Sequence, residues 1–299
     1  TGCLVRDAGG TERRVRARVV VLACSAVETA RLLLLSRSRG HPDGLANSSG
    51  LVGRNLQFSS YSGGAGVFRL DRPEEERRIL LERHPFVGRS LQDFYRLPSG
   101  TASGLDKGGT IRFGFPHPNP IFTALRLARL EGGLAWGATL KRRMRKHWLE
   151  TRTIEFEAFA DFHPNPGTRV ELDPDVVDRW GLPAARIHLA VPPVHVRAGE
   201  FLQARGLEVL EAAGADEVLP GDVAGVTGHL VHGTCRAGTD PARSVVDRDG
   251  RAHDVDNLYV SDGSYFPTSG GVPTTLPILP PARRLGEAIA ERGRRGDFR

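Results

Sequence analysis

The chain has 299 residues, of which 39% are hydrophobic and 25% are charged, so it can bury one large core or two ordinary ones. Arginines interrupt the apolar runs before they reach the roughly 20 residues that a membrane-spanning helix needs, and we therefore expect no membrane span. The net charge of +6 comes mostly from scattered arginines, and the one dense basic block, at 141–147, has no interleaved aromatic residues, so we expect no nucleic-acid partner.

The cysteines and the first residue bear on the cellular compartment. Cys3, Cys24 and Cys235 are odd in number and far apart, which argues against a disulfide framework and favours a reducing compartment such as the cytoplasm. The chain begins at Thr1 and its only methionine is Met144, so we interpret it as a fragment or a processed product. Localisation therefore stays open.

The first sixty residues predict an α/β arrangement. Residues 5–17 are expected to form a short strand pair, and residues 19–23 form an apolar run typical of a strand buried on both faces. Residues 26–35 then have helical spacing. A strand that passes into a helix through Cys24 and Ser25 either offers the helix amides to a ligand or simply packs strand against helix.

The middle of the chain predicts an antiparallel sheet. Residues 153–162 alternate apolar with acidic side chains, the period-two pattern of a strand with one face on the core. Residues 194–213 have the composition of a helix, with Gly214 as its C-terminal cap. The basic block at 141–147 (KRRMRKH) is interpreted as a solvated helix face before a strand that starts near Arg152, in preference to a binding patch.

The most distinctive stretch runs from Gly228 to Leu279 and combines a His-Gly-Thr turn, an Asp-Gly-Ser corner and a Gly-Gly loop. Its motifs, in chain order, are His232-Gly233-Thr234-Cys235-Arg236, Ser244-Val245-Val246-Asp247, Asn257-Leu258-Tyr259-Val260, Asp262-Gly263-Ser264, Phe266-Pro267-Thr268 and Gly270-Gly271. In this order they resemble the C-terminal signature of the glucose-methanol-choline (GMC) family of flavin oxidoreductases. Residues 18–36, 49–56 and 168–183 contain weaker similarities to the same family.

The resemblance implies the fold class and the domain organisation. We expect an α/β protein with α+β elements, in which an antiparallel-sheet substrate domain is inserted into a partial FAD-binding Rossmann-like domain. The expected boundaries are 1–60 for the remnant of the FAD-binding domain, 61–227 for the substrate domain, and 228–299 for the part that completes the FAD domain and the active site. The family's glycine-rich pyrophosphate fingerprint has no match here, so a missing N-terminal FAD-binding segment is implied as a partner.

The resemblance further implies FAD-dependent oxidation of a small-molecule alcohol or sugar hydroxyl to a carbonyl, which needs a base near the hydroxyl. In the family a histidine three residues before the Gly-Thr pair has this role, and here that position is Leu230. A one-residue slip in the alignment makes His229 the base, which we narrowly prefer, whereas a direct His-Gly-Thr match favours His232. The alternative function is a catalytically silent remnant, or a basic interaction module, that retains the fold.

The same histidines also allow a metal interpretation. His229, His232, Cys235 and His253 carry the usual zinc donors, imidazole and thiolate. Their spacing matches no standard zinc pattern with a paired second half. We therefore expect no metal site.

Two turns are implied to contact the cofactor. Asp262 and Gly263 correspond to the corner that lies against the flavin's ribityl and phosphate portion, where glycine permits close backbone approach and the acid accepts a hydroxyl proton. The other interpretation of this pair is a turn that closes a strand. Cys24 and Ser25 stand where the family usually has an Ala-Gly turn close to the flavin.

The segment after the Gly-Gly loop departs from the family pattern. Pro273 replaces an Asn that helps to hold the substrate hydroxyl, and we expect Thr274 and Thr275 to supply hydroxyls at the cofactor instead. Three more prolines follow, and proline in a helix interior costs about 3 kcal/mol. The sequence therefore predicts a late helix, from Pro281 to Arg292.

Overall fold

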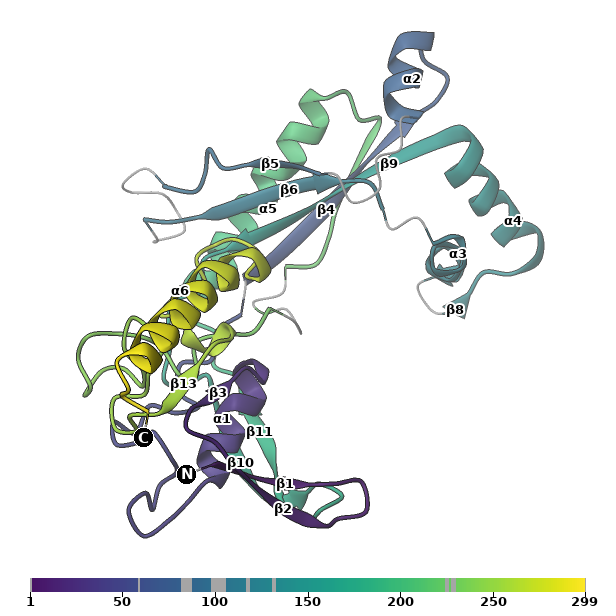
Figure 1. The fold of residues 1–299 in the computed structure, drawn as a ribbon. Helices are drawn as coiled ribbons and strands as arrows, with labels where there is room; N and C mark the ends of the chain where they lie inside the picture. Colours follow the sequence, from purple (N-terminus) through teal and green to yellow (C-terminus); the bar gives the residue numbers. More distant parts are fainter. Residues whose placement is uncertain are drawn as a thin grey trace. The chain divides into compact units, whose positions relative to one another are not determined.

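The computed structural model describes residues 2–58, 60–81, 88–97, 106–116, 119–130, 133–223, 226 and 230–298. The chain divides into two compact units (Figure 1). Unit 1 combines Thr1–Ser59, Asp161–Pro192 and Val226–Arg299, and unit 2 combines Ser60–Ala160 and Pro193–Gly225. Helices and an antiparallel sheet occur together, so the expected α/β class with an antiparallel-sheet domain is confirmed.

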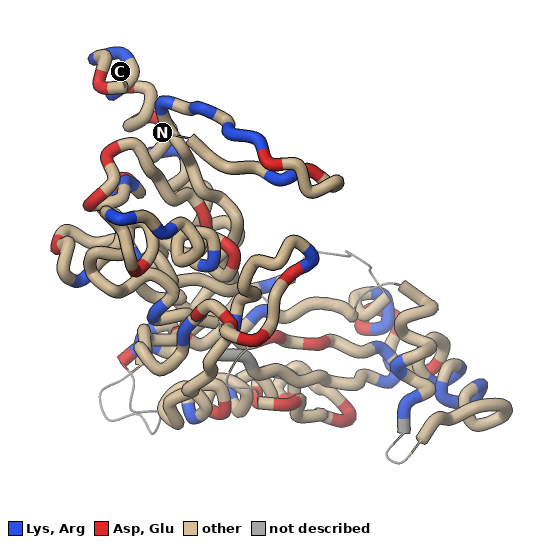
Figure 2. Tube along the Cα trace, turned by 90° about the horizontal axis from the view of Figure 1, so that it is seen from below, with Lys and Arg blue, Asp and Glu red and all other residues tan. Residues whose placement is uncertain are grey.

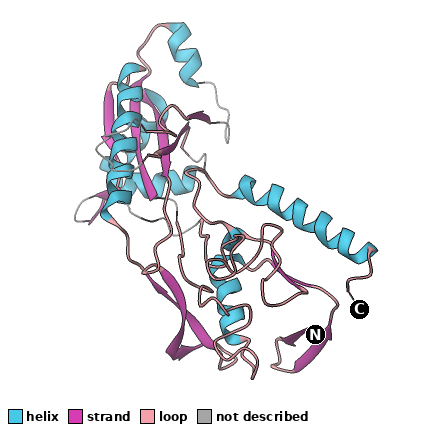
Figure 3. Ribbon diagram, turned by 90° about the vertical axis from the view of Figure 1, so that its left-hand side faces the viewer, coloured by secondary structure: helices cyan, strands magenta, loops and turns pink. Residues whose placement is uncertain are grey.

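Unit 2 is built on a five-stranded antiparallel sheet in the order β12-β4-β9-β6-β5. The strands are β4 (Ser60–Arg69), β5 (Arg89–Leu91), β6 (Gly109–Gly114), β9 (Thr151–Ala160) and β12 (Glu217–Pro220). The alternation in β9 places Phe156 and Ala158 in the core, as predicted for one buried face. Helix α5 (Pro193–Ala212) covers this face and buries Leu202 and Leu210 against it (Figure 3). Gly214, at φ +82°, ends the helix as expected.

The other described elements of unit 2 are short helices and strands. They are α2 (Glu74–Leu81), α3 (Pro120–Ala128), β7 (Arg129–Leu130), β8 (Gly133–Leu134), α4 (Gly137–Arg145) and a π-helical turn, Lys146–Glu150. Helix α3 begins where the sequence allows it, because the Asn119 side chain accepts hydrogen bonds from the amides of Ile121 (3.0 Å) and Phe122 (3.1 Å). The predicted basic helix is α4 with the π-helical turn, which leads directly into β9.

Unit 1 joins both ends of the chain. Its elements are β1 (Gly2–Arg6), β2 (Glu12–Arg16), β3 (Val20–Leu22), α1 (Ser25–Leu35), β10 (Arg169–Val177), β11 (Pro183–His188), β13 (Leu258–Val260), a 3₁₀ turn (Gly263–Tyr265) and α6 (Thr275–Arg294). Strands β1 and β2 form the predicted hairpin. Strand β3 pairs in parallel with β13, so the strand before α1 and the strand before the Asp262 corner end at the same edge.

The hairpin of β10 and β11 belongs to unit 1, whereas the sequence placed residues 161–192 within the middle domain. Arg31 of α1 explains the difference, because it donates hydrogen bonds of 2.7 Å to the Asp178 carboxylate and to the Pro183 carbonyl. Val170 is also buried in the core of unit 1. The chain therefore returns to unit 1 for one hairpin before it completes unit 2.

Helix α6 begins earlier than predicted, at Thr275 instead of Pro281. The first proline inside it, Pro277, falls in the first turn, where an N–H would have no intrahelical partner. Pro280 and Pro281 do lie inside the helix. The helix packs beside the end of β13, where Leu285 is buried and Ile278 lines the same pocket as Val260. Within the described ranges, no helix is both long and apolar enough to cross a bilayer.

Candidate active site

Three segments of unit 1 meet at the edge formed by β3 and β13: the turn at His232, the corner at Asp262 and the start of α1. The amide of Gly233 donates to the carbonyl of Gly263 at 3.1 Å, which places the first two side by side. The hydroxyl of Thr234 donates to the Ala26 carbonyl at 2.7 Å, which fixes the turn to the first turn of α1. The histidine turn and the aspartate corner, which the sequence predicted to cooperate, are therefore in direct contact.

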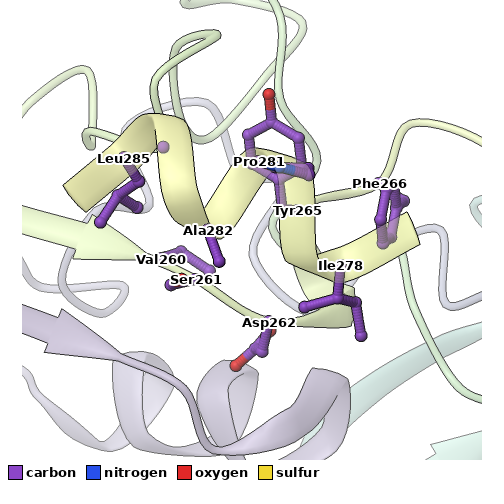
Figure 4. A pocket seen from close by; sticks show the side chains of 10 residues that line it. Val260, Ser261, Asp262, Tyr265, Phe266, Ile278, Pro281, Ala282 and Leu285 are labelled. Carbon is purple, nitrogen blue, oxygen red and sulfur yellow. The ribbon is translucent and has the colours of Figure 1, made fainter. Parts of the chain in front are cut away.

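Asp262 is held by hydrogen bonds from two sides. Its Oδ2 accepts from the Thr29 hydroxyl of α1 at 2.6 Å, and its Oδ1 accepts from the Ser264 amide at 2.8 Å and the Ser264 hydroxyl at 2.5 Å. Figure 4 shows this carboxylate pointing away from α6, toward α1. Thr29 also accepts a bond from the Cys24 amide at 3.2 Å, so one threonine connects the corner with the turn before the helix.

Cys24 and Ser25 form an exposed turn beside Asp262. Cys24 is the N-cap residue of α1, but its side chain accepts no capping hydrogen bond, so the amides of the first turn lack that partner. Ser25 has φ +72°, a left-handed conformation that glycine adopts at less cost than serine. This backbone angle explains why the family that the sequence resembles usually has glycine at this position, as the second residue of its Ala-Gly turn.

Gly263 allows the aspartate corner to approach the histidine turn closely, and Gly233 allows the histidine turn to approach the segment at Asn55. A Cβ atom on Gly233, which has φ +94°, would lie 2.4 Å from the Asn55 carbonyl oxygen. A Cβ atom on Gly263 would lie 2.7 Å from the Val231 carbonyl oxygen. Both contacts are far inside van der Waals distance, so any larger residue would push the segments apart.

His232 is completely buried next to this junction. Its backbone exchanges two hydrogen bonds with Gln57, and its ring meets the Phe266 ring edge to face at 6.5 Å. Among the described residues, neither ring nitrogen has a hydrogen-bond partner, which is rare for a buried imidazole. Burial lowers the pKa of the ring to about 4, against an opposing effect of the Asp161 carboxylate, so the imidazole is neutral at pH 7.

Asp161 was not among the residues that the sequence singled out. It is 2% exposed and accepts a hydrogen bond from the Ser269 hydroxyl at 2.9 Å, and its Oδ2 lies 3.6 Å from Nε2 of His163. An acidic residue in the polar register of a strand predicts a solvent-facing side chain. Asp161 lies directly after β9, where the chain leaves the sheet for unit 1. The alternation of buried and exposed side chains ends with the strand, so it does not predict the exposure of Asp161.

The remaining predicted residues are less tightly connected to this junction. His229 lies outside the residues that the structure describes, and Leu230 after it has φ +60°. Thr274 is buried at the N-cap of α6, and Thr275 is exposed at the first position of the helix. No described hydrogen bond joins either threonine to Asp262, although Ile278, one turn later, lines the same pocket as Asp262.

His229 lies outside the described residues, and the other proposed metal donors, His232, Cys235 and His253, are not arranged as a metal site. Burial raises the pKa of the Cys235 thiol to about 12, which disfavours the thiolate that binds metal. His253 forms a 2.8 Å hydrogen bond with Ser244. Within the described part of the chain, no group of three or more His, Cys, Asp or Glu side chains is arranged to hold a metal ion.

The two sides of Asp262 differ in the space that they leave for a cofactor. Under α6 the pocket lined by Asp262, Phe266 and Ile278 has a volume of about 10 Å³, enough for a single water molecule (Figure 4). A flavin ring does not fit there. The opposite side, where the Asp262 carboxylate faces the exposed turn at Cys24 and Ser25, presents a hydrogen-bond acceptor beside helix amides, which suits the polar part of a dinucleotide.

Comparison with known proteins shows what this chain is similar to. Residues 164–280 match the family model of GMC oxidoreductases. The chain is 35% identical over 294 residues to 6'''-hydroxyparomomycin C oxidase of Streptomyces lividus, a match covering 96% of this chain and 47% of that protein. It is 32% identical over 286 residues to 2-methyl-1,2-propanediol dehydrogenase of Mycolicibacterium austroafricanum, covering 95% of this chain and 50% of that protein. The chain thus spans about half the length of these relatives.

A solved structure has the same fold. Pyridoxine 4-oxidase from Mesorbium loti superimposes with a TM-score of 0.53 at 20% identity, over 96% of this chain and 54% of that one. The sequence match includes the histidine turn and the aspartate corner, both of which lie within residues 164–280. Residues 164–280 are therefore similar to the C-terminal region of GMC oxidoreductases, and most of the chain is similar to proteins named as oxidases and dehydrogenases.

Proposed function

We propose that the protein containing this chain oxidises an alcohol or sugar hydroxyl to a carbonyl, with FAD as its cofactor. The observation that carries the proposal is the junction of the histidine turn, the aspartate corner and the start of α1 through the bonds of Gly233, Thr234 and Asp262. The relatives support it, since their names describe an oxidase and a dehydrogenase.

In this proposal the chain's residues divide between holding the cofactor and moving a proton. Asp262 and Gly263, with the turn at Cys24 and Ser25, hold the polar part of FAD, and the hydroxyls of Thr274 and Thr275 contact a different part of the cofactor from the start of α6. When bound, the flavin accepts the hydride that leaves the substrate carbon. A segment outside this chain binds the adenine-proximal pyrophosphate.

A histidine accepts the proton from the substrate hydroxyl as the C–H bond breaks, so that the alcohol loses one proton and one hydride and becomes a carbonyl. His229 is the first candidate, because a general base works best when its pKa is near the operating pH, and burial lowers the pKa of His232 to about 4. His232 remains the second candidate. Its neutral ring, without a partner among the described residues, is able to accept a hydrogen bond.

The test is flavin reduction in the full-length protein under anaerobic conditions. The first substrates are 2-methyl-1,2-propanediol and 6'''-hydroxyparomomycin C, after the names of the two relatives. With a substrate that reduces the flavin, we expect His229→Ala to slow the loss of flavin absorbance at least about 100-fold. If His229→Ala leaves the rate unchanged and His232→Ala slows it, His232 is the base.

The silent-remnant alternative makes the opposite prediction. The oxidase proposal expects the full-length protein to purify yellow, with the flavin lost or weakened when Asp262 is changed to Ala. A colourless protein that binds no added FAD would reject the oxidase and favour the remnant.

A further inference from the structure

Exposed apolar side chains gather on α3 and the hairpin that follows it. Ile121, Phe122 and Leu125 of α3 are 71%, 59% and 62% exposed, and their spacing places them on one face of the helix. Leu134 in β8 is 70% exposed, and Trp136, directly before α4, is 84% exposed. Single exposed leucines are common, but a large exposed cluster with a tryptophan usually marks an interaction site.

Helix α4, which packs beside α3, presents cations instead. Lys141, Arg142 and Arg145 are exposed at positions that share one face, and Lys146 follows in the π-helical turn. Among the described residues, Lys141, Arg142 and Lys146 form no ion pair with a carboxylate, while Arg145 lies 3.4 Å from Glu150. No described carboxylate of unit 2 therefore neutralises Lys141, Arg142 or Lys146 (Lys and Arg are blue in Figure 2).

The two helices are held together, so the apolar and the basic side chains lie on neighbouring elements. The Arg143 side chain of α4 donates to the Arg129 carbonyl in β7 at 3.4 Å, and the Ala135 amide donates to the Ala128 carbonyl at the end of α3 at 2.6 Å. We call the set formed by Ile121, Phe122, Leu125, Leu134, Trp136, Lys141, Arg142 and Lys146 the α3–α4 surface. Between Asn119 and Leu149 the only carboxylate in the sequence is Glu131, which lies outside the described residues.

We propose that the α3–α4 surface binds the surface of an anionic phospholipid bilayer. Apolar side chains that include a tryptophan enter the boundary between headgroups and acyl chains, while adjacent lysines and arginines bind the phosphates. Charge complementarity favours this occupant over a second copy of the chain, because two such surfaces would bring their unpaired cations together. The chain then lies on the bilayer without crossing it.

The test is cosedimentation of the full-length protein with vesicles. We expect binding to vesicles of equal parts phosphatidylcholine and phosphatidylglycerol, weakening with added salt, and little binding to phosphatidylcholine alone. Each cation near an anionic surface contributes about a 5-fold increase in affinity, so the double variant Lys141→Gln, Arg142→Gln is expected to bind about 25-fold more weakly. The matched control Arg14→Gln, Arg39→Gln removes two exposed, unpaired arginines of unit 1 and is expected to bind normally.

A second variant tests the apolar part. Phe122→Ser with Trp136→Ser removes two exposed side chains, so it should leave the folded state intact and reduce vesicle binding at least about 10-fold. Equal binding to neutral and anionic vesicles, no binding to either, or equal losses in the Lys141 and Arg14 double variants would overturn the proposal. A protein that stays off the vesicles and dimerises through Trp136 would assign the α3–α4 surface to a second copy.

Discussion

The hydroxyl of Thr29 donates a 2.6 Å hydrogen bond to the carboxylate of Asp262, across 233 positions of the sequence. This bond links the first helix of the chain to the corner after its last strand. The same hydroxyl oxygen accepts from the Cys24 amide, so Thr29 positions both turns that we propose to hold the cofactor. A residue without an obvious role in the sequence thus organises the candidate site.

The first prediction concerns this bond. Thr29→Val keeps the shape of the side chain but leaves Oδ2 of Asp262 without its donor and the Cys24 amide without its acceptor. Because hydrogen bonds to charged groups are the stronger ones, we expect a loss of about 2 kcal/mol in the free energy of unfolding, measured by chemical denaturation. Thr139→Val, at an exposed position of α4, is the control and should change it by less than about 0.5 kcal/mol. Equal effects of the two variants would show that the Thr29 bond contributes nothing.

The second prediction concerns the left-handed backbone of Ser25. Glycine relieves the cost of φ +72°, although it also increases the entropy of the unfolded chain. We expect Ser25→Gly to raise the free energy of unfolding by about 1 kcal/mol. The control is Ser48→Gly, because Ser48 is exposed and outside the left-handed region, and this variant should lower the free energy of unfolding. A lower free energy of unfolding in both variants would show that the backbone of Ser25 is not strained.

The third prediction separates steric overlap from backbone strain. Gly233 and Gly181 both have positive φ, but a Cβ atom on Gly181 would meet nothing within 4 Å, whereas on Gly233 it would strike the Asn55 carbonyl. We expect Gly181→Ala to cost about 1 kcal/mol and Gly233→Ala at least about 3 kcal/mol in thermal unfolding. Similar losses of stability in the two variants would mean that the backbone of the histidine turn shifts at little cost to make room for the Cβ atom.

The fourth prediction is a dependence of stability on pH. Burial lowers the pKa of His232 from 6.5 to about 4, with Asp161 opposing the shift, so between these values the unfolded chain binds a proton that the folded chain does not. Stability should therefore decrease as the pH falls from 6.5 toward 4, by up to roughly 3 kcal/mol from this group. In His232→Gln the free energy of unfolding should fall less steeply over that range, whereas the control His41→Gln should keep the wild-type slope. An unchanged slope in His232→Gln would assign the acid sensitivity to other groups.

Local patterns account for the parts of the fold that the sequence predicts well. The alternation in β9, the cap at Gly214 and the hairpin of β1 and β2 depend on neighbouring residues, and all three are found. The start of α6 was predicted wrongly, because Pro277 and Pro280 were expected to exclude a helix, whereas Pro277 lies in the first turn and Pro280 lies inside the helix.

Some residues of the candidate site are also predicted by local sequence patterns, and others are not. Its motifs identify Asp262 and His232, because their residue types and spacing are distinctive. The burial of Asp161 and the link made by Thr29 follow from contacts between distant segments, which no local pattern contains. The left-handed angle at Ser25 is equally hidden, since serine at that position gives no sign of it.

The parallel pairing of β3 with β13 has a consequence for synthesis on the ribosome. Val20–Leu22 leave the exit tunnel long before Leu258–Val260, so the first strand of unit 1 must wait for almost the entire chain before it finds its partner. Unit 2 is complete once Gly225 has been synthesised, so it is able to fold before unit 1. A chaperone that protects the nascent segment around Val20–Leu22 should therefore influence the yield of this protein more than one that acts on the finished chain.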